Sequence, residues 1–240
     1  MSTIKINNKL ATKIVAHRGL SGVETENTNA AFVAAGNRSY YGIETDIHRT
    51  VDGRFVVCHD DNLSRIAGVD MDVESSTLSD LRNVILFDKD GRKDREDLRV
   101  SVLENYIAIC KKYDKHCVLE LKSAFTDEEI ASILAIIDAF DYLENVTFIS
   151  FNYDNLLKVR HHRSDQSVQF LYMTPEEGLV DRLVADSMDV DIHYRSLTKE
   201  MVDSLHQRGL KVNCWTVDNK ETAEQLCAWG VDYITSNILE

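Results

Sequence analysis

The 240-residue sequence lacks the long apolar run that a membrane-spanning helix requires. Such a helix needs about 20 consecutive apolar residues, and no segment of this chain approaches that length. The first ten residues, MSTIKINNKL, also lack the apolar stretch of a secretory signal peptide. The sequence therefore predicts a cytoplasmic protein with no membrane span.

Cysteines are few and scattered along the chain. There are five of them, which is an odd number, and no two are arranged as a CxxC pair. A disulfide framework or a cysteine-based zinc site is therefore not expected. We predict free thiols that pack in the interior as small apolar side chains.

Positive charge is also in deficit. The chain has 27 Lys and Arg against 40 Asp and Glu, which gives a formal net charge of −13. This balance disfavours nucleic-acid binding through a broad basic surface. An anionic small-molecule substrate is still compatible with the composition, but a bound cation and a few basic side chains would have to supply local positive charge. In the alternative interpretation, the acidity serves only solubility.

Short apolar stretches rich in Val, Ile, Phe and Tyr alternate with helix-like stretches along most of the chain. They predict eight strands, near 13–17, 42–48, 55–59, 116–122, 145–151, 168–173, 189–194 and 211–216. Eight buried strands in this alternation, in a chain of this length, predict a single (β/α)8 TIM-type barrel. An open doubly wound sheet is the alternative.

Capping patterns mark several of the expected helices. Thr126 with Glu129 forms a capping-box pattern before an apolar face with helical spacing. Ser101 with Glu104 repeats that pattern, and Asn27 is expected to cap the first helix.

Two places break the alternation. Residues 51–54 join the second and third expected strands and are too short to form a crossover helix. Residues 61–100 are long, charged and irregular, which predicts a small insertion after strand three. We therefore expect 1–240 to be one barrel domain with an inserted subdomain at about 61–100. The charged run 88–97 predicts a solvated loop, whereas its apolar flanks could pack as a lid over the active site.

Seven polar side chains lie at the ends of four consecutive expected strands. They are His17, Arg18, Glu44, Asp46, His59, Glu120 and Lys122. Catalytic groups of such barrels lie at the C-terminal ends of the strands. Residues two apart on a strand point to the same face, so Glu44 pairs with Asp46 and Glu120 pairs with Lys122. We therefore predict that the seven side chains converge on one site.

The residue types in this set suggest phosphodiester chemistry. Three buried carboxylates persist only when they are paired or bound to metal, and oxygen ligands suit one Mg2+ or Ca2+. The two histidines can give and take protons near neutral pH, and Arg18 and Lys122 can neutralise phosphate oxygens. Each element alone has a structural alternative, such as an ordinary ion pair between Glu120 and Lys122.

The order and spacing of these motifs resemble the glycerophosphodiester phosphodiesterase family. The resemblance is carried by AHRG, ENT followed by AF, GIETDI, TVDGRFVVCHD and ELK, and it is densest over 14–65. VSVLE, SF at 150–151, Trp215 and the closing GVDYITS fall where the family has comparable elements. The resemblance therefore extends over nearly the whole chain.

The resemblance implies a barrel with a small inserted subdomain and the hydrolysis of glycerophosphodiesters to glycerol 3-phosphate and an alcohol. Carried over by position, His17 and His59 become the acid–base pair, and Glu44, Asp46 and Glu120 become the metal ligands. Arg18 and Lys122 become phosphate contacts. Trp215 could wall the site against the carbons of the substrate or pack in the core.

The sequence departs from the family pattern at three positions. Thr25 and Ser101 stand where the family commonly has Pro, and Ser236 stands where the closing motif usually has Asp. These positions lie in loops and at the last strand end, so the departures bear on substrate preference more than on chemistry.

Two other functions share parts of this pattern. A phospholipase D of the sphingomyelinase type has a similar barrel, but it resembles secreted, disulfide-bearing chains, and this chain shows neither sign. A non-catalytic barrel that binds phosphodiesters would be expected to lose a histidine or a metal ligand, and here all seven positions are present. The alcohol, the metal and the oligomeric state are not indicated by the sequence.

Overall fold

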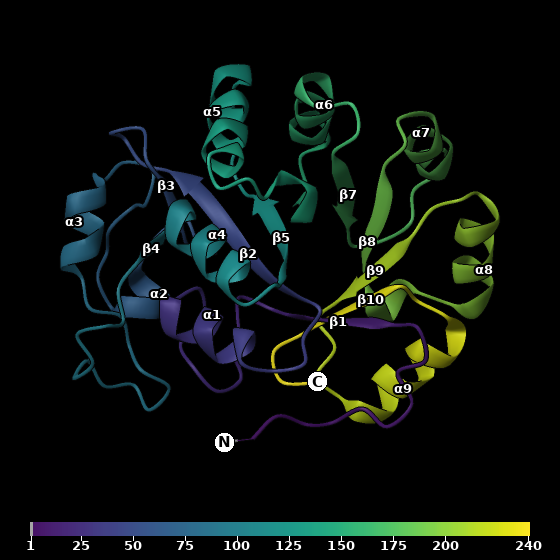
Figure 1. Cartoon of the computed structure of the whole chain (residues 1–240), viewed down its shortest axis with the longest axis horizontal. Coiled ribbons are helices and arrows are strands. Elements are labelled where there is room, and N and C mark those ends of the chain that lie inside the picture. The colour runs from purple at the N-terminus through teal and green to yellow at the C-terminus, as the bar shows by residue number, and fades with distance from the viewer. Residues whose placement is uncertain (1) are drawn as a thin grey trace.

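Eight parallel strands of this computed structural model, which describes residues 2–240, close into a barrel surrounded by helices (Figure 1). Pairing of β1 with both β2 and β10 completes the ring. The eight strands are β1 (Lys13–Ala16), β2 (Gly42–Arg49), β5 (His116–Leu121), β6 (Val146–Ser150), β7 (Ser167–Tyr172), β8 (Asp189–His193), β9 (Val212–Trp215) and β10 (Tyr233–Ser236). The predicted (β/α)8 barrel is confirmed, and the open-sheet alternative is wrong.

Strand membership differs from the prediction in one respect. The third expected strand is β3 (Phe55–Val57), which pairs antiparallel with β2 and then with β4 (Ser101–Val102). The short turn after β2 allows only a hairpin, because a parallel neighbour needs a longer crossover. The eighth barrel strand is instead β10, so the insertion follows the second barrel strand, and Trp215 ends the seventh.

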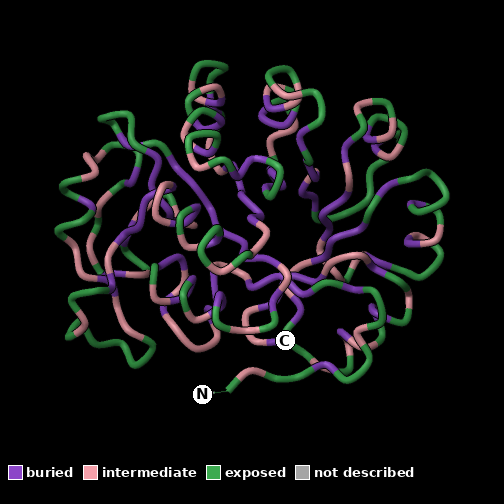
Figure 2. The backbone as a smooth tube through the Cα atoms, viewed as in Figure 1, coloured by how far each residue is buried: buried purple, intermediate pink, exposed green. Residues whose placement is uncertain are grey.

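The helices cover the outside of the barrel. They are α1 (Asn29–Gly36), α4 (Leu103–Lys112), α5 (Asp127–Asp138), α6 (Tyr153–His162), α7 (Leu179–Ala185), α8 (Lys199–Gln207) and α9 (Lys220–Trp229), with short 3-10 turns η1 (Leu143–Asn145) and η2 (Tyr194–Ser196). Figure 2 shows buried backbone along the strands and exposed backbone on the outer side of the helices. The capping box of Thr126 and Glu129 is confirmed. The Ser101 cap is wrong, because that residue lies in β4 and its hydroxyl donates to Asn29.

The segment between β3 and β4 packs around its own apolar cluster. It contains α2 (Ser64–Ala67) and α3 (Leu78–Asn83). Leu63, Leu81, Leu86 and Leu98 are buried there in a cluster distinct from the main core. The charged run 88–97 is mostly exposed. Both expectations for the insertion therefore hold in part: the flanks pack, and the charged run faces solvent.

The five cysteines are free and buried, as predicted. No helix within residues 2–240 combines the length and the apolar character needed to cross a bilayer.

Candidate active site

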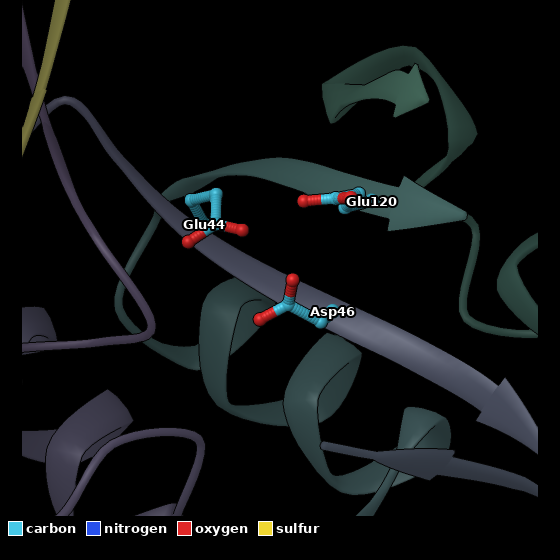
Figure 3. A group of neighbouring side chains, drawn as sticks. All are labelled: Glu44, Asp46 and Glu120. Atoms are coloured by element: carbon cyan, nitrogen blue, oxygen red, sulfur yellow. The ribbon is translucent and has the colours of Figure 1, made fainter. Parts of the chain in front are cut away.

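Three carboxylates meet at the carboxyl ends of two neighbouring barrel strands. Glu44 and Asp46 lie on β2, and Glu120 lies on β5 directly opposite Asp46 in the strand register. One oxygen from each residue lies within 4.8 Å of the others, and Figure 3 shows the three side chains gathered between the two strands. This arrangement follows from strand geometry, because parallel neighbours lie about 4.8 Å apart and alternate residues share a face.

Burial and neighbouring charges shift the pKa values of all three carboxylates. Burial, followed by the charge of Asp46, raises the pKa of Glu44 well above its usual value and that of Glu120 to about 8. Burial also acts to raise the pKa of Asp46, but the charges of Arg18 and Lys122 outweigh it, so that pKa is lowered. The three carboxylates therefore repel one another, and they would gain from a shared cation.

The carboxylate oxygens fit a hard divalent cation. Asp46 Oδ1 is buried and has no hydrogen-bond partner among residues 2–240, which leaves an acceptor free for a metal. Asp46 Oδ2 accepts a hydrogen bond of 2.8 Å from the amide of Asn27, which fixes the orientation of the carboxylate. Oxygen donors of this kind suit Mg2+ or Ca2+, so Glu44, Asp46 and Glu120 could hold such an ion.

Two cationic side chains border the carboxylates. Lys122 Nζ lies 3.0 Å from Glu120 Oε1 and 3.7 Å from Asp46 Oδ1. Arg18 Nε lies 3.6 Å from Asp46 Oδ2 and, although buried, makes no hydrogen bond within the described part of the chain. Arg18 Nη1 donates to Glu26 Oε1 at 2.8 Å. The site therefore has local positive charge and an unused hydrogen-bond donor, although the chain as a whole is acidic.

The loop after β1 holds Arg18 in an unusual backbone conformation. Arg18 has φ of 54° and Gly19 has φ of 75°, and both lie in the left-handed region. A Cβ on Gly19 would lie 2.7 Å from the backbone of Ala31, so only glycine fits there. The turn directs the backbone N–H of Arg18 to Glu44 Oε2 at 2.8 Å, which ties the loop to the acidic group.

His17 is buried, and a side-chain network fixes its ring. Its Nδ1 lies 2.8 Å from Asn237 Oδ1. The Asn237 amide nitrogen donates to Asp218, so the oxygen that faces His17 must accept, and we assign the proton to Nδ1. His17 Nε2 then offers a lone pair on the side of Glu44, 4.0 Å from its Oε2. Burial, followed by the charge of Arg18, lowers the pKa of His17 to about 4, so the ring is neutral at neutral pH.

His59 is more exposed than His17 and has a charged partner. Its Nδ1 lies 2.6 Å from Asp60 Oδ1. The pKa of Asp60 is lowered to about 2: burial opposes the shift, while hydrogen bonds from Arg65 and His59 produce it. Since an ionised carboxylate can only accept, His59 Nδ1 donates and Nε2 is left free. Burial lowers the pKa of His59, and the charge of Asp46 partly opposes this effect.

One cavity brings together the predicted site residues except Asp46, which lies buried beside it. It is lined by His17, Arg18, Glu44, His59, Glu120, Lys122, Ile149, Phe151, Leu171, Asp191, Trp215, Thr216 and Thr235. Trp215 packs edge-on against Phe151, with ring centroids 5.7 Å apart. None of the lining residues belongs to 61–100, so the expectation that the insertion covers this cavity as a lid is not supported. The apolar flanks pack on each other and on Ala30 of α1.

Sequence reasoning missed the residues that hold this site in place. Asn27 does not cap α1: Thr28 does, and Asn27 instead binds Asp46 and Thr45. The second contact is a hydrogen bond donated by Thr45 Oγ1 to Asn27 Oδ1. Asp60, which follows His59 directly, could have been found from its position, whereas Asn237 is 220 residues away from His17 and gave no sequence signal.

Two relatives align with nearly the whole chain. The glycerophosphodiester phosphodiesterase of Caldanaerobacter subterraneus subsp. tengcongensis is 29% identical, with 95% of each chain covered. That of Bacillus altitudinis is 25% identical, with 93% of each chain covered.

Two solved structures share the fold. A glycerophosphodiester phosphodiesterase from Parabacteroides distasonis superposes with a TM-score of 0.79 at 26% identity and covers 95% of this chain and 93% of its own. An Oleispira antarctica phosphodiesterase in complex with the product sn-glycerol-3-phosphate has a TM-score of 0.86 at 24% identity, with 94% and 93% covered. The Glycerophosphoryl diester phosphodiesterase family matches residues 17–239. The chain therefore belongs to the glycerophosphoryl diester phosphodiesterase family and is a phosphoric diester hydrolase.

Proposed function

We propose that this enzyme hydrolyses glycerophosphodiesters to glycerol 3-phosphate and an alcohol by two-histidine, metal-dependent catalysis. The observation that supports this most strongly is that two histidines, two cationic side chains and two of the three clustered carboxylates line one cavity of a chain that belongs to this family. The substrate is a small molecule that the cavity can admit. We further propose that 1–240 is one catalytic domain with an inserted subdomain at about 61–100.

Glu44, Asp46 and Glu120 would hold one Mg2+ or Ca2+. When bound, the ion would supply positive charge that stabilises the developing charge on the phosphate. The free acceptor on Asp46 and the mutual repulsion of the carboxylates support this assignment. Arg18 and Lys122 would contact the phosphate oxygens beside the ion, since both side chains border the carboxylates and Arg18 Nε lacks a partner.

The environments of the two histidines suggest different roles. His17 is kept neutral by burial and has a free lone pair on Nε2, which suits a general base. Burial lowers the pKa of His59, while the charge of Asp46 and the hydrogen bond to Asp60 act against this shift. We assign His59 as the general acid because the ionised Asp60 accepts from Nδ1 and would stabilise the imidazolium form. In the proposed reaction, His17 takes the proton of the attacking oxygen, and His59 gives a proton to the departing alkoxide as the P–O bond breaks.

Two oxygens can act as the nucleophile with the same two histidines. Attack by water gives glycerol 3-phosphate directly. Attack by the free glycerol hydroxyl gives a cyclic phosphate, which water opens in a second step. In both routes Trp215 and Phe151 would lie against the carbon atoms of the substrate, because they belong to the apolar part of the cavity wall.

A product panel tests the proposal. Glycerophosphocholine, glycerophosphoethanolamine, glycerophosphoinositol and lysophospholipids would each be incubated with Mg2+, with Ca2+ and with EDTA. We expect glycerol 3-phosphate and free alcohol from at least one glycerophosphodiester, and no turnover in EDTA. Turnover that persists in EDTA would contradict the metal dependence. Release of choline from lysophospholipids without cleavage of any glycerophosphodiester would contradict the substrate class.

A further inference from the structure

The inserted segment does not reach the cavity, yet one of its side chains is connected to two groups of the site. Arg65 lies on α2, which Figure 1 shows next to α1 at the edge of the barrel. Its guanidinium forms hydrogen bonds with two carboxylates, Asp60 and Glu26, which belong to different loops. Each of these carboxylates contacts one residue that lines the cavity, so the insertion acts on the site from outside.

The first arm runs through Asp60 to His59. Arg65 Nε donates to Asp60 Oδ2 at 2.6 Å, and Arg65 Nη2 donates to Asp60 Oδ1 at 3.1 Å. Asp60 Oδ1 also accepts from His59 Nδ1 at 2.6 Å. Both carboxylate oxygens are therefore engaged, and the carboxylate cannot rotate without losing a charged hydrogen bond. This arrangement fixes the ring of His59, which lines the cavity, and leaves Nε2 on the side of the ring away from Asp60.

The second arm runs through Glu26 to Arg18. Arg65 Nη2 donates to Glu26 Oε1 at 2.7 Å, and Arg65 Nη1 donates to Oε2 at 2.9 Å. Glu26 Oε1 also accepts from Arg18 Nη1 at 2.8 Å. One planar guanidinium thus holds both carboxylates, a geometry that Arg provides and Lys does not.

We propose that Arg65 is a positioning residue through which the inserted segment orients both the proton-transferring His59 and the phosphate-binding Arg18. The inference rests on the proposed function for the roles of these two residues. Arg65 is itself about half exposed, and exposed ion pairs contribute little to stability. Its loss should therefore misplace the two side chains more than it unfolds the chain.

The test uses two diesters of glycerol phosphate that differ in how much their leaving group needs a proton. One is glycerophosphocholine, whose choline alkoxide departs only when it is protonated. The other is a glycerophospho-p-nitrophenyl ester, whose phenolate departs without a proton. The His59 arm is reported by the kcat/KM for glycerophosphocholine divided by the kcat/KM for the p-nitrophenyl ester. The fraction of folded enzyme cancels in this ratio. A KM increase common to both substrates reports the Arg18 arm.

We expect Arg65→Ala to lower this ratio on the order of 10-fold, since misplacing a reacting group by about 1 Å can cost 100-fold in rate. Arg65→Lys should fall between Arg65→Ala and wild type. The matched control is Arg95→Ala. Arg95 also lies in the insertion and pairs at 2.7 Å with Glu24, which lies in the same loop as Glu26. That pair does not extend to His59 or Arg18, and we expect the control to keep the wild-type ratio.

Two results would overturn the inference, and a third would overturn the proposed function on which it rests. An unchanged ratio in Arg65→Ala and Arg65→Lys would mean that Arg65 does not position His59. An equal fall in Arg95→Ala would mean that the effect is a general loosening of the insertion. A wild-type enzyme that cleaves neither diester would contradict the proposed function itself, and only that result does so.

Discussion

The loop after β1 and the strands β2 and β5 bring ionisable side chains to the cavity, whereas β6, β7 and β9 bring apolar ones. The first side carries His17, Glu44 and Glu120, and the second carries Ile149, Leu171 and Trp215. The difference suggests that the two sides have different roles. The first side would bind the ion and the phosphate and transfer protons, and the second would contact the carbon atoms of the substrate. Changes on the first side should therefore lower kcat, and changes on the second should alter KM and substrate preference.

Asp191 is the exception on the second side. It lies on β8, is buried, and leaves Oδ1 without a hydrogen-bond partner. Burial, followed by the charge of Glu120, raises the pKa of Asp191 well above its usual value. Asp191 therefore places one carboxyl group on an otherwise apolar side of the cavity.

The largest effect is expected from the histidines of the charged side. His17→Ala and His59→Ala should each lower kcat by roughly 10²–10⁴-fold, the range for a lost acid–base group, while circular dichroism shows a retained fold. His206→Ala is the control, because His206, like His59, is paired with an aspartate, Asp232, at 2.9 Å, but does not line the cavity. Near-wild-type turnover in either cavity variant would show that the proton transfers are wrongly assigned.

A smaller effect is expected on the apolar side. Trp215→Ala should raise KM by about 10-fold with kcat nearly unchanged, since it removes apolar contact made equally in the ground and transition states. Trp229→Ala is the control, because Trp229 packs on the main core away from the cavity. Steady-state kinetics on two different alcohols would check this. A Trp215 variant that lost kcat instead of KM would break the proposed division.

The smallest effect is a pH dependence of stability. The pKa of Glu120 is raised from 4.5 to about 8 in the folded chain. The folded state therefore binds this proton more tightly than the unfolded state does. The resulting stability is fully present below about pH 4.5 and is lost as the pH rises through about 8. A cation needs the ionised carboxylates, so its stabilising effect should grow over the same window. The rise in Tm on adding Ca2+ should therefore increase between about pH 5.5 and 8. Glu120→Gln should flatten this slope, and an equal slope in that variant would contradict the assignment.

The sequence was sufficient to predict the barrel and the charged side of the cavity because both depend on local pattern. Alternation along β2 places Glu44 and Asp46 on one face, and the apolar strands themselves predict a barrel. The sequence was insufficient to predict the hairpin at β3, because a buried antiparallel strand has the same composition as a buried parallel one. The contacts of Asn27, Asn237 and Arg65 also escaped prediction, since each joins segments that only the closed fold brings together.

A cation held by Glu44, Asp46 and Glu120 is central to the proposed chemistry. A crystal structure of the enzyme grown in Ca2+, together with one of Asp46→Asn under the same conditions, tests it. We expect one ion bonded to all three carboxylates in the wild type, at about 2.3–2.6 Å, and none at this position in the variant. An ion bound elsewhere, or carboxylates more than about 5 Å from any shared point, would contradict the account, because no calcium–oxygen bond has that length.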